Sequence, residues 1–230
     1  EALVEAVKTN RVVAIGEYHA PDSLHRELGA QVMPKLKEAG ATHLAIELCT
    51  NRKDKLFLPN GKVDIDQLAS LLQHHEFTRL LEVAKQQGIE VVPVDSPYDH
   101  ATRTLESRNQ HMADAIGGIL AANPNNRVVF WVGNYHLTTR SLPGEGPSAV
   151  KLLREQGHSV SSFYGQHDNY WREEPLRGIV DPRKPVSVPV ASAPLFAKQT
   201  WYHRDQPGHD IHRFDEFDHL LIYPQYRIMD

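Results

Sequence analysis

Short apolar runs alternate along this chain with segments of helical pattern, and this alternation constrains the fold more than any other feature. A continuous apolar run bounded by glycine or polar residues indicates a strand buried on both faces, as in parallel sheets. The runs that fit lie at 11–15, 43–48, 89–94, 127–132 and 158–164. Between them, helical patterns occupy 22–39, 64–87, 102–122 and 146–156. We therefore expect an α/β fold with an open, mostly parallel sheet covered by helices.

The length of 230 residues allows one sizeable core and does not require a second domain. We expect a single domain over 1–230, with a core of about 11–165 and a closing strand at about 218–223. Residues 166–210 are rich in proline and show no clean period. They are expected to form an irregular wrap or an insertion.

Composition narrows the class of partner. The net charge is −4 without a basic block, which argues against a nucleic-acid partner, and no apolar stretch has the length of a transmembrane helix. The single cysteine, Cys49, excludes an internal disulfide. The chain starts at Glu1 without a signal-like segment, as in a processed or trimmed product. The expectation is a soluble protein, either exported (periplasmic or secreted) or cytoplasmic.

Two of the apolar runs end in the same tetrapeptide pattern, Gly-x-Tyr-His. The first is Gly16-Glu17-Tyr18-His19, and the second is Gly133-Asn134-Tyr135-His136. If the strand order is the common 3-2-1-4-5, the first and fourth strands are neighbours where the order reverses. His19 and His136 are then expected to face each other, with Glu47 one strand away.

Ligands of open parallel sheets bind beyond the carboxyl ends of the strands, and here those ends carry several titratable groups. A single polar residue at a strand end is more often a cap or a loop residue than a ligand. Convergence of a whole set on one sheet edge favours function instead. The residues expected to form the catalytic group are Glu17, His19, Glu47 and His136.

Further polar residues are expected to support this group. Asn109 lies inside the apolar stripe of its helix, so its amide must bond to a strand end or a loop. Arg108 beside it suits either the binding of an anionic substrate group or a structural ion pair with a carboxylate. For His25, a surface or capping position is favoured slightly over ligation. The other supporting candidates lie within the two tetrapeptides and are Tyr18, Tyr135 and Asn134.

The chain resembles the TIKI/TraB and ChaN-like superfamily. The segments that carry the resemblance are the two tetrapeptides, Leu137 after the second of them, Glu106–Ala113 and Leu152–Gly157. Erythromycin esterases are similar more distantly. The resemblance covers about 11–165 and implies an erythromycin esterase/ChaN-like sheet. TIKI proteins are regarded as metal-dependent proteases with paired Gly-x-x-His motifs and a glutamate. ChaN-like proteins bind haem for iron uptake, and erythromycin esterases activate water with histidine and glutamate.

The resemblance and the residues together leave three functions open. The first is a hydrolase of peptide or ester bonds. Its divalent ion (Mn, Co or Zn) would be held by His19, His136, Glu17 and Glu47, and a metal-free variant would use a histidine as base, oriented by a glutamate. The second is a haem-binding protein with a tyrosine or histidine axial ligand. The third is an inactive binding or toxin-associated domain. The expected partner is a peptide or a small-molecule substrate, and a homodimer stays open.

Overall fold

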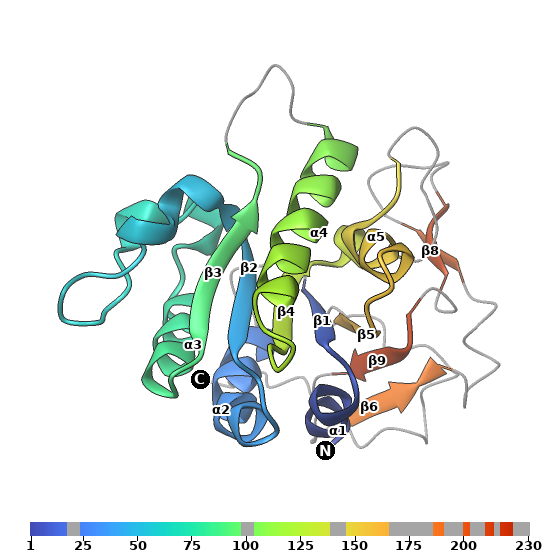
Figure 1. Ribbon diagram of the computed structural model, residues 1–230, viewed down its shortest axis with the longest axis horizontal. Helices are drawn as coiled ribbons and strands as arrows, with labels where there is room; N and C mark the ends of the chain where they lie inside the picture. The colour runs from blue at the N-terminus through green and yellow to red at the C-terminus, as the bar shows by residue number, and fades with distance from the viewer. Residues whose placement is uncertain are drawn as a thin grey trace, which may run out of the picture.

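The computed structural model shows a single domain built on one central sheet (Figure 1). The residues that the structure describes are 1–17, 24–97, 104–138, 146–165, 186–190, 200–202, 210–213 and 217–222. The strands of the sheet are β1 (Val12–Glu17), β2 (His43–Cys49), β3 (Glu90–Asp95), β4 (Val128–Gly133), β5 (Val160–Gly165), β6 (Val186–Pro189) and β9 (His219–Ile222). Their order is β3-β2-β4-β1-β5-β9-β6, and only the β6–β9 pair is antiparallel. The expected mostly parallel open sheet is confirmed.

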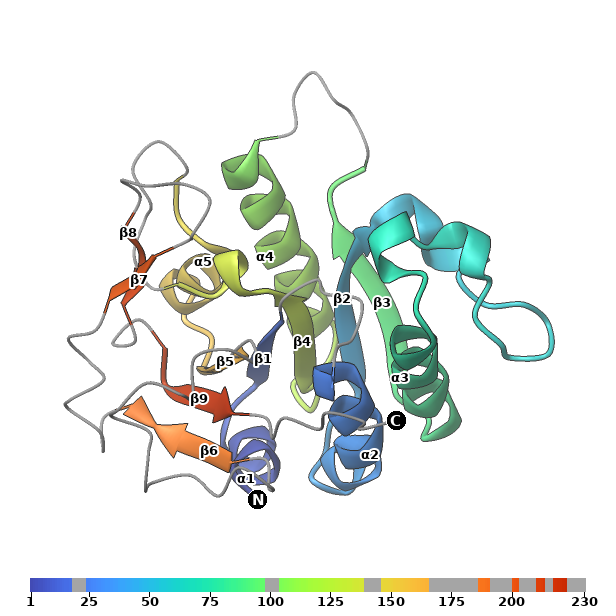
Figure 2. The ribbon, with the colours of Figure 1, turned by 180° about the vertical axis from the view of Figure 1, so that it is seen from behind.

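Helices cover both faces of this sheet (Figure 2). They are α1 (Ala2–Thr9), α2 (Leu24–Glu38), α3 (His75–Gln86), α4 (Leu105–Ala122) and α5 (Ala149–Glu155). Strand alternation divides the core into two layers. Val13 and Ile15 of β1 join the layer under α1, α2 and α3, whereas Val12 and Ala14 join the layer under α4 and α5.

The strand order differs from the expected 3-2-1-4-5 in one respect. β4 lies between β1 and β2 and pairs with both. The predicted neighbours β1 and β4 are therefore adjacent, but β2 borders β4 and not β1. The buried strands have similar apolar sequences, so the sequence pattern could not show which strand lies between which neighbours in the sheet. The consequence is that Glu47, on β2, lies next to the end of β4.

Other segments refine the predicted elements. Residues 64–87 were expected to be helical, but α3 begins only at His75 and is preceded by the short 3-10 turns η1 (Thr50–Lys55), η2 (Ile65–Gln67) and η3 (Ser70–Leu72). α1 was not predicted. Within the proline-rich stretch, β6 pairs with β9 at the sheet edge, where Pro189 costs no ladder bond to a further strand. Val188 and Val190 are buried in the core, so this part of the stretch packs against the sheet.

Two small features complete the described chain. β7 (Thr200–Tyr202) and β8 (Asp210–Arg213) form a separate antiparallel ribbon. None of the helices in the described ranges combines the length and the apolar character needed to cross a bilayer.

Candidate functional site

The carboxyl ends of β1 and β2 each carry a glutamate, and the two side chains lie on opposite faces of the sheet. Glu17 follows Val13 and Ile15 in alternation and contacts Arg26 of α2. Glu47 follows Ala45 of the other layer and contacts Arg108 of α4. The structure thus separates two carboxylates that the sequence analysis had grouped in one catalytic set.

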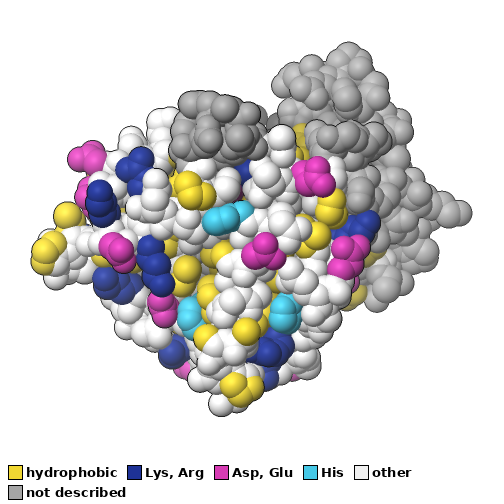
Figure 3. Space-filling model, turned by 45° about the horizontal axis from the view of Figure 1, so that its top comes forward, with side chains coloured by type: hydrophobic (Ala, Val, Ile, Leu, Met, Phe, Trp, Pro, Cys, Tyr) yellow, Lys and Arg dark blue, Asp and Glu magenta, His cyan; other side chains and the backbone are white. Residues whose placement is uncertain are grey.

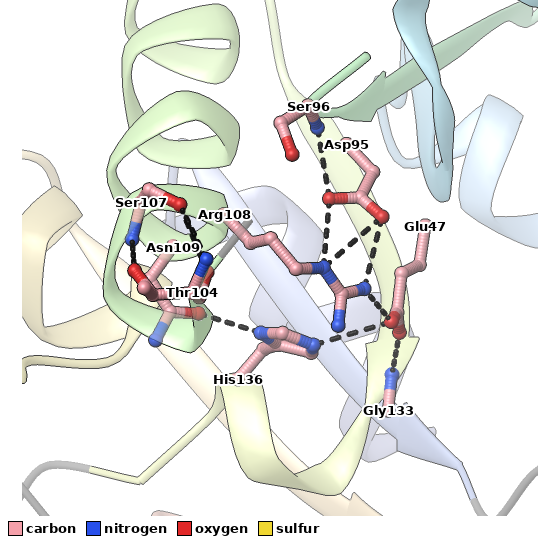
Figure 4. Close-up of polar contacts among 9 residues, drawn as sticks. All are labelled: Glu47, Asp95, Ser96, Thr104, Ser107, Arg108, Asn109, Gly133 and His136. Atoms are coloured by element: carbon pink, nitrogen blue, oxygen red, sulfur yellow. Dashed lines mark hydrogen bonds and ion pairs between the residues drawn. The ribbon is translucent and has the colours of Figure 1, made fainter. Parts of the chain in front are cut away.

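Glu47 is held by groups from three elements (Figure 4). Its Oε1 accepts a hydrogen bond from Arg108 Nη2 and lies 3.2 Å from His136 Nε2. Its Oε2 accepts from the backbone N–H of Gly133, at 2.8 Å. Its side chain is 12% exposed, so this carboxylate lies at the rim of the protein and in reach of solvent.

Arg108 joins Glu47 to a second carboxylate, that of Asp95 at the end of β3. Arg108 Nε donates to Asp95 Oδ1 at 3.0 Å, and Nη2 donates to Asp95 Oδ2 at 2.9 Å. Burial opposes the charge of Arg108, but the hydrogen bonds and charges of Asp95 and Glu47 outweigh it and raise the pKa of Arg108 above its ordinary value. The guanidinium is therefore a permanent positive charge between two carboxylates.

The start of α4 sets the position of Arg108. Thr104 caps the helix, because its Oγ1 accepts from Ser107 N at 3.0 Å and Ser107 Oγ accepts from Thr104 N at 3.0 Å. Arg108 follows in the next position, with Nε and Nη2 turned toward the strand ends. Among the described residues, no hydrogen bond reaches Arg108 Nη1. One nitrogen of the fork is thus left for a ligand.

His136 is buried, 3% exposed, in the 3-10 turn η4 (Asn134–His136) directly after β4. Its Nδ1 lies 2.5 Å from Asn109 Oδ1, and Asn109 Nδ2 donates to the carbonyl of Pro147 at 2.9 Å. Because the amide nitrogen already donates to a carbonyl, Oδ1 must accept, and Nδ1 of His136 must carry the hydrogen. The expected tie of Asn109 to a loop is confirmed. His136 Nε2 then faces Glu47.

The remaining candidates are placed as follows. Asn134 donates to Gly165 O at 2.9 Å and accepts from Gly165 N at 3.2 Å, so its amide ties η4 to the end of β5. A Cβ on Gly16 would lie 2.0 Å from Asn134 Oδ1, which explains the first glycine of the motif. His25 is buried on α2, not on the surface, and Tyr135 is half-buried.

Tyr18 and His19 lie outside the described residues. The expected meeting of His19 with His136 therefore stays a prediction.

Three residues that bond to Glu17 or to Arg108 were not among the candidates. Asp95 ends an apolar run, as Glu47 does, and this position was the signal for it. Arg26 and Trp131 contact Glu17, but no motif marks them. With the top of the molecule turned forward, acidic, basic and histidine side chains are scattered over the described surface (Figure 3).

The described donors do not suit a divalent ion. Within the described ranges, no group of three or more histidine, cysteine, aspartate or glutamate residues has the geometry to hold a metal. The oxygens of Glu47 already contact Arg108, Gly133 and His136, and the guanidinium also occupies Asp95. A divalent ion would have to displace that guanidinium from both carboxylates. No chemical step is therefore assigned to a metal at these residues.

Neither a protein-family model nor a curated protein sequence matches this chain. Solved structures match it in fold. A Bacillus cereus protein has a TM-score of 0.58 and 13% identity, over 97% of this chain and 90% of that protein. ChaN of Campylobacter jejuni, solved with cofacially bound haem, has a TM-score of 0.54 and 11% identity, over 97% and 91%. The type III effector HopBA1 has a TM-score of 0.51 and 18% identity, over 75% and 83%.

At these identities the matches show a shared fold, and they support the resemblance to ChaN-like proteins at that level. The chain also matches longer bacterial toxin structures, of which it spans 35% and 36%.

Proposed function

We propose that the chain is a hydrolase that cleaves a peptide or ester bond at the carboxyl edge of its sheet. The residues assigned to the reaction are His136, Glu47 and Arg108, with Asn109 and Asp95 holding them in place. The observation that carries the proposal is the fixed orientation of His136, which Asn109 holds at Nδ1 while Nε2 points to Glu47 and the rim.

His136 is the proton carrier in this proposal. An asparagine that accepts from Nδ1 leaves Nε2 as the basic nitrogen, as in Cys-His-Asn sites. Nε2 takes a proton from the attacking water and returns it to the leaving group, and Glu47 stabilises the imidazolium between these steps. General acid–base catalysis of this kind contributes about 10²- to 10⁴-fold to a rate.

Arg108 supplies the positive charge that the reaction needs. Nη1 is available to the oxyanion that forms when water attacks the carbonyl, because Nε and Nη2 hold the guanidinium against Asp95 and Glu47. A donor already fixed in this way stabilises the transition state without reorganisation, and its removal costs about 10²- to 10³-fold in kcat.

Haem binding is the second candidate function, because the similarity to ChaN of Campylobacter jejuni extends over 97% of this chain. An axial ligand would have to come from a histidine or a tyrosine with an open coordination position. His136 is 3% exposed and its Nε2 lies 3.2 Å from Glu47 Oε1, so a haem iron would have to displace Glu47 to reach this nitrogen. Tyr135, the motif tyrosine within the described ranges, is half-buried and would have to exchange its present contact for the iron.

The test is hydrolysis of a panel of nitrophenyl esters and fluorogenic peptides by the wild type and by His136→Gln and Glu47→Gln. His75→Gln, exposed on α3 behind the opposite face of the sheet, is the matched control. We expect a loss of at least about 10²-fold for the first two variants and none for the control, at unchanged melting temperature. Wild-type rates in His136→Gln would overturn the proposal.

Two further measurements separate the alternatives. Activity that is lost with a chelator and restored by Mn, Co or Zn would favour the metal-dependent form. A Soret band on haemin titration, without turnover of any panel substrate, would favour haem binding. If the wild type neither turns over a substrate nor binds haem or metal, the third possibility, an inactive binding or toxin-associated domain, is favoured.

A further inference from the structure

A second polar cluster lies on the opposite face of the sheet, sealed from solvent. Arg26 is 0% exposed and Glu17 is 3% exposed. Arg26 Nε donates to Glu17 Oε2 at 2.9 Å, and Nη2 donates to Oε1 at 2.7 Å. Trp131 Nε1 donates to Glu17 Oε2 at 2.5 Å. Among the described residues, Arg26 of α2 and Trp131 of β4 thus hold the carboxylate.

A buried ion pair of this kind contributes little net stability to a protein core. Desolvating an ion pair offsets most of its attraction, and well-packed apolar residues at such positions are often as stable or more so. In addition, Arg26 Nη1 is buried and has no hydrogen-bond partner among the described residues, and the ring of Phe77 lies 4.9 Å from the guanidinium carbon. A cluster that stability alone does not favour points to a role in function.

The cluster is connected to the candidate site through β4. Glu17 is paired in register with Gly133, whose N–H donates to Glu47 on the other face. Trp131 lies two residues before Gly133 and five before His136. The hydrogen bond between Trp131 and Glu17 therefore joins β1 to β4 at the last paired residues before the site.

The helix that carries Arg26 is packed closely against the same tryptophan. A Cβ on Gly29 of α2 would lie 2.6 Å from the Trp131 ring. The indole is therefore confined between the helix and the strands, with its N–H aimed at Glu17. Its position allows little displacement of β4 along the sheet.

We propose that Arg26 and Trp131 are positioning residues, which fix the end of β4 through Glu17 and thereby hold Gly133 and His136 against Glu47. The role rests on the proposed function for its catalytic meaning, but the positioning itself is a property of the fold. Displacements of about 1 Å at a catalytic group cost about 10²-fold in rate, so a loosened β4 end is expected to lower kcat.

The experiment measures the ring nitrogens of His136 directly. Protein labelled with ¹⁵N-histidine gives imidazole signals, and the signals of His136 are assigned by their disappearance in His136→Gln. Trp131→Phe removes the indole N–H and keeps an aromatic ring, and Arg26→Lys keeps the charge and loses the fork. Leu36→Ala, in the same core layer on α2, is the control for lost packing alone.

We expect both test variants to shift the His136 signals and to lower kcat about tenfold or more at nearly constant KM. The control is expected to lower the melting temperature without moving those signals. The double variant Glu17→Gln/Arg26→Met separates folding from positioning, because it removes the buried charges together. We expect the double variant to have a melting temperature close to that of the wild type. Its His136 signals are expected to stay shifted and its kcat to stay low.

The outcomes distinguish the two proposals. If the His136 signals stay in place in Trp131→Phe and Arg26→Lys, the positioning role is overturned, whatever the wild-type activity. If the signals move but no protein, wild type included, hydrolyses the panel, the positioning stands and the proposed hydrolase fails. Should Arg26→Lys not fold, Trp131→Phe alone decides.

Discussion

Two glutamate–arginine pairs lie at the carboxyl edge of the sheet, and they differ in their exposure and in the groups around them. Glu17 and Arg26 are 2% and 0% exposed in their side chains and bond in a fork geometry. Glu47 and Arg108 are 12% and 22% exposed. The first pair meets an indole N–H, whereas the second meets another carboxylate and an imidazole.

This difference in exposure and in neighbours suits the two pairs to different roles. A carboxylate that is 2% exposed and held by an arginine fork and an indole N–H is placed to hold structure. The rim pair lies beside a histidine, and its arginine has a nitrogen, Nη1, to which no described residue bonds, which suits the contact with a substrate that we propose. Glu17 belongs to the Gly-x-Tyr-His motif, yet Glu47 is the more exposed glutamate, and it is the one that the proposed function uses.

The largest expected effect comes from breaking the sealed pair. Arg26→Met leaves the charge of Glu17 buried and uncompensated, and we expect the free energy of unfolding to fall by about 3–5 kcal/mol. Urea denaturation followed by circular dichroism measures it. Arg79→Met, which removes a surface arginine from Glu27, is the matched control and is expected to cost about 0–1 kcal/mol. Equal losses in the two variants would contradict the distinction.

Breaking the rim pair should cost less stability and more activity. Arg108→Met leaves two neighbouring carboxylates, Glu47 and Asp95, without their shared cation, but solvent partly screens them. We expect a loss of about 2–3 kcal/mol in the free energy of unfolding, together with a loss of panel hydrolysis. A loss of stability larger than that of Arg26→Met, measured by the same denaturation, would reverse the comparison.

The sequence predicted the fold because its signals are local. The strands β1 to β5 each stand as an apolar run, whereas the helix bounds were predicted less well, because α1 was missed and α3 begins at His75 and not at residue 64. The order of the strands depends on contacts between segments far apart in the chain, and no single run records them. The apolar pattern of the sequence therefore could not predict that β4 lies between β1 and β2.

The same limit applies to the site. Strand ends were correctly expected to gather at one edge, and Asn109 was correctly expected to bond to a loop. The side of the sheet on which each end residue lies follows from alternation along its own strand, which separates Glu17 from Glu47. Arg26 and Trp131 escaped notice because an arginine on a helix and a tryptophan in an apolar run look ordinary until they are seen to converge.

Asn109 offers a finer test of the rim site. Asn109→Leu removes the acceptor for His136 Nδ1 and the donor to the carbonyl of Pro147. We expect the free energy of unfolding to fall by about 1–2 kcal/mol, because both buried partners lose their hydrogen bond. Asn109→Asp keeps an acceptor and is expected to retain more panel hydrolysis than the leucine variant. Equal activity in both would show that the orientation of His136 does not depend on this residue.

The smallest expected effect concerns pH and lies away from both pairs. Burial lowers the pKa of His219 below its ordinary value of 6.5, although Asp218 acts in the opposite direction. Burial also lowers the pKa of His43 and of His158. A histidine whose pKa is lower in the folded state takes up protons preferentially when unfolded. Its contribution to stability is complete above 6.5 and is lost as the pH falls through the folded-state pKa.

His219→Phe tests this contribution, because a phenyl ring can keep the stacking on Phe163, whose ring centre lies 4.4 Å away, without titrating. Between about pH 7 and about pH 5, we expect the urea midpoint of this variant to fall less than that of the wild type. The exposed His75→Gln should follow the wild type. If His219→Phe loses stability as steeply as the wild type, the acid sensitivity belongs to other groups, and the two glutamate–arginine pairs become the next residues to titrate.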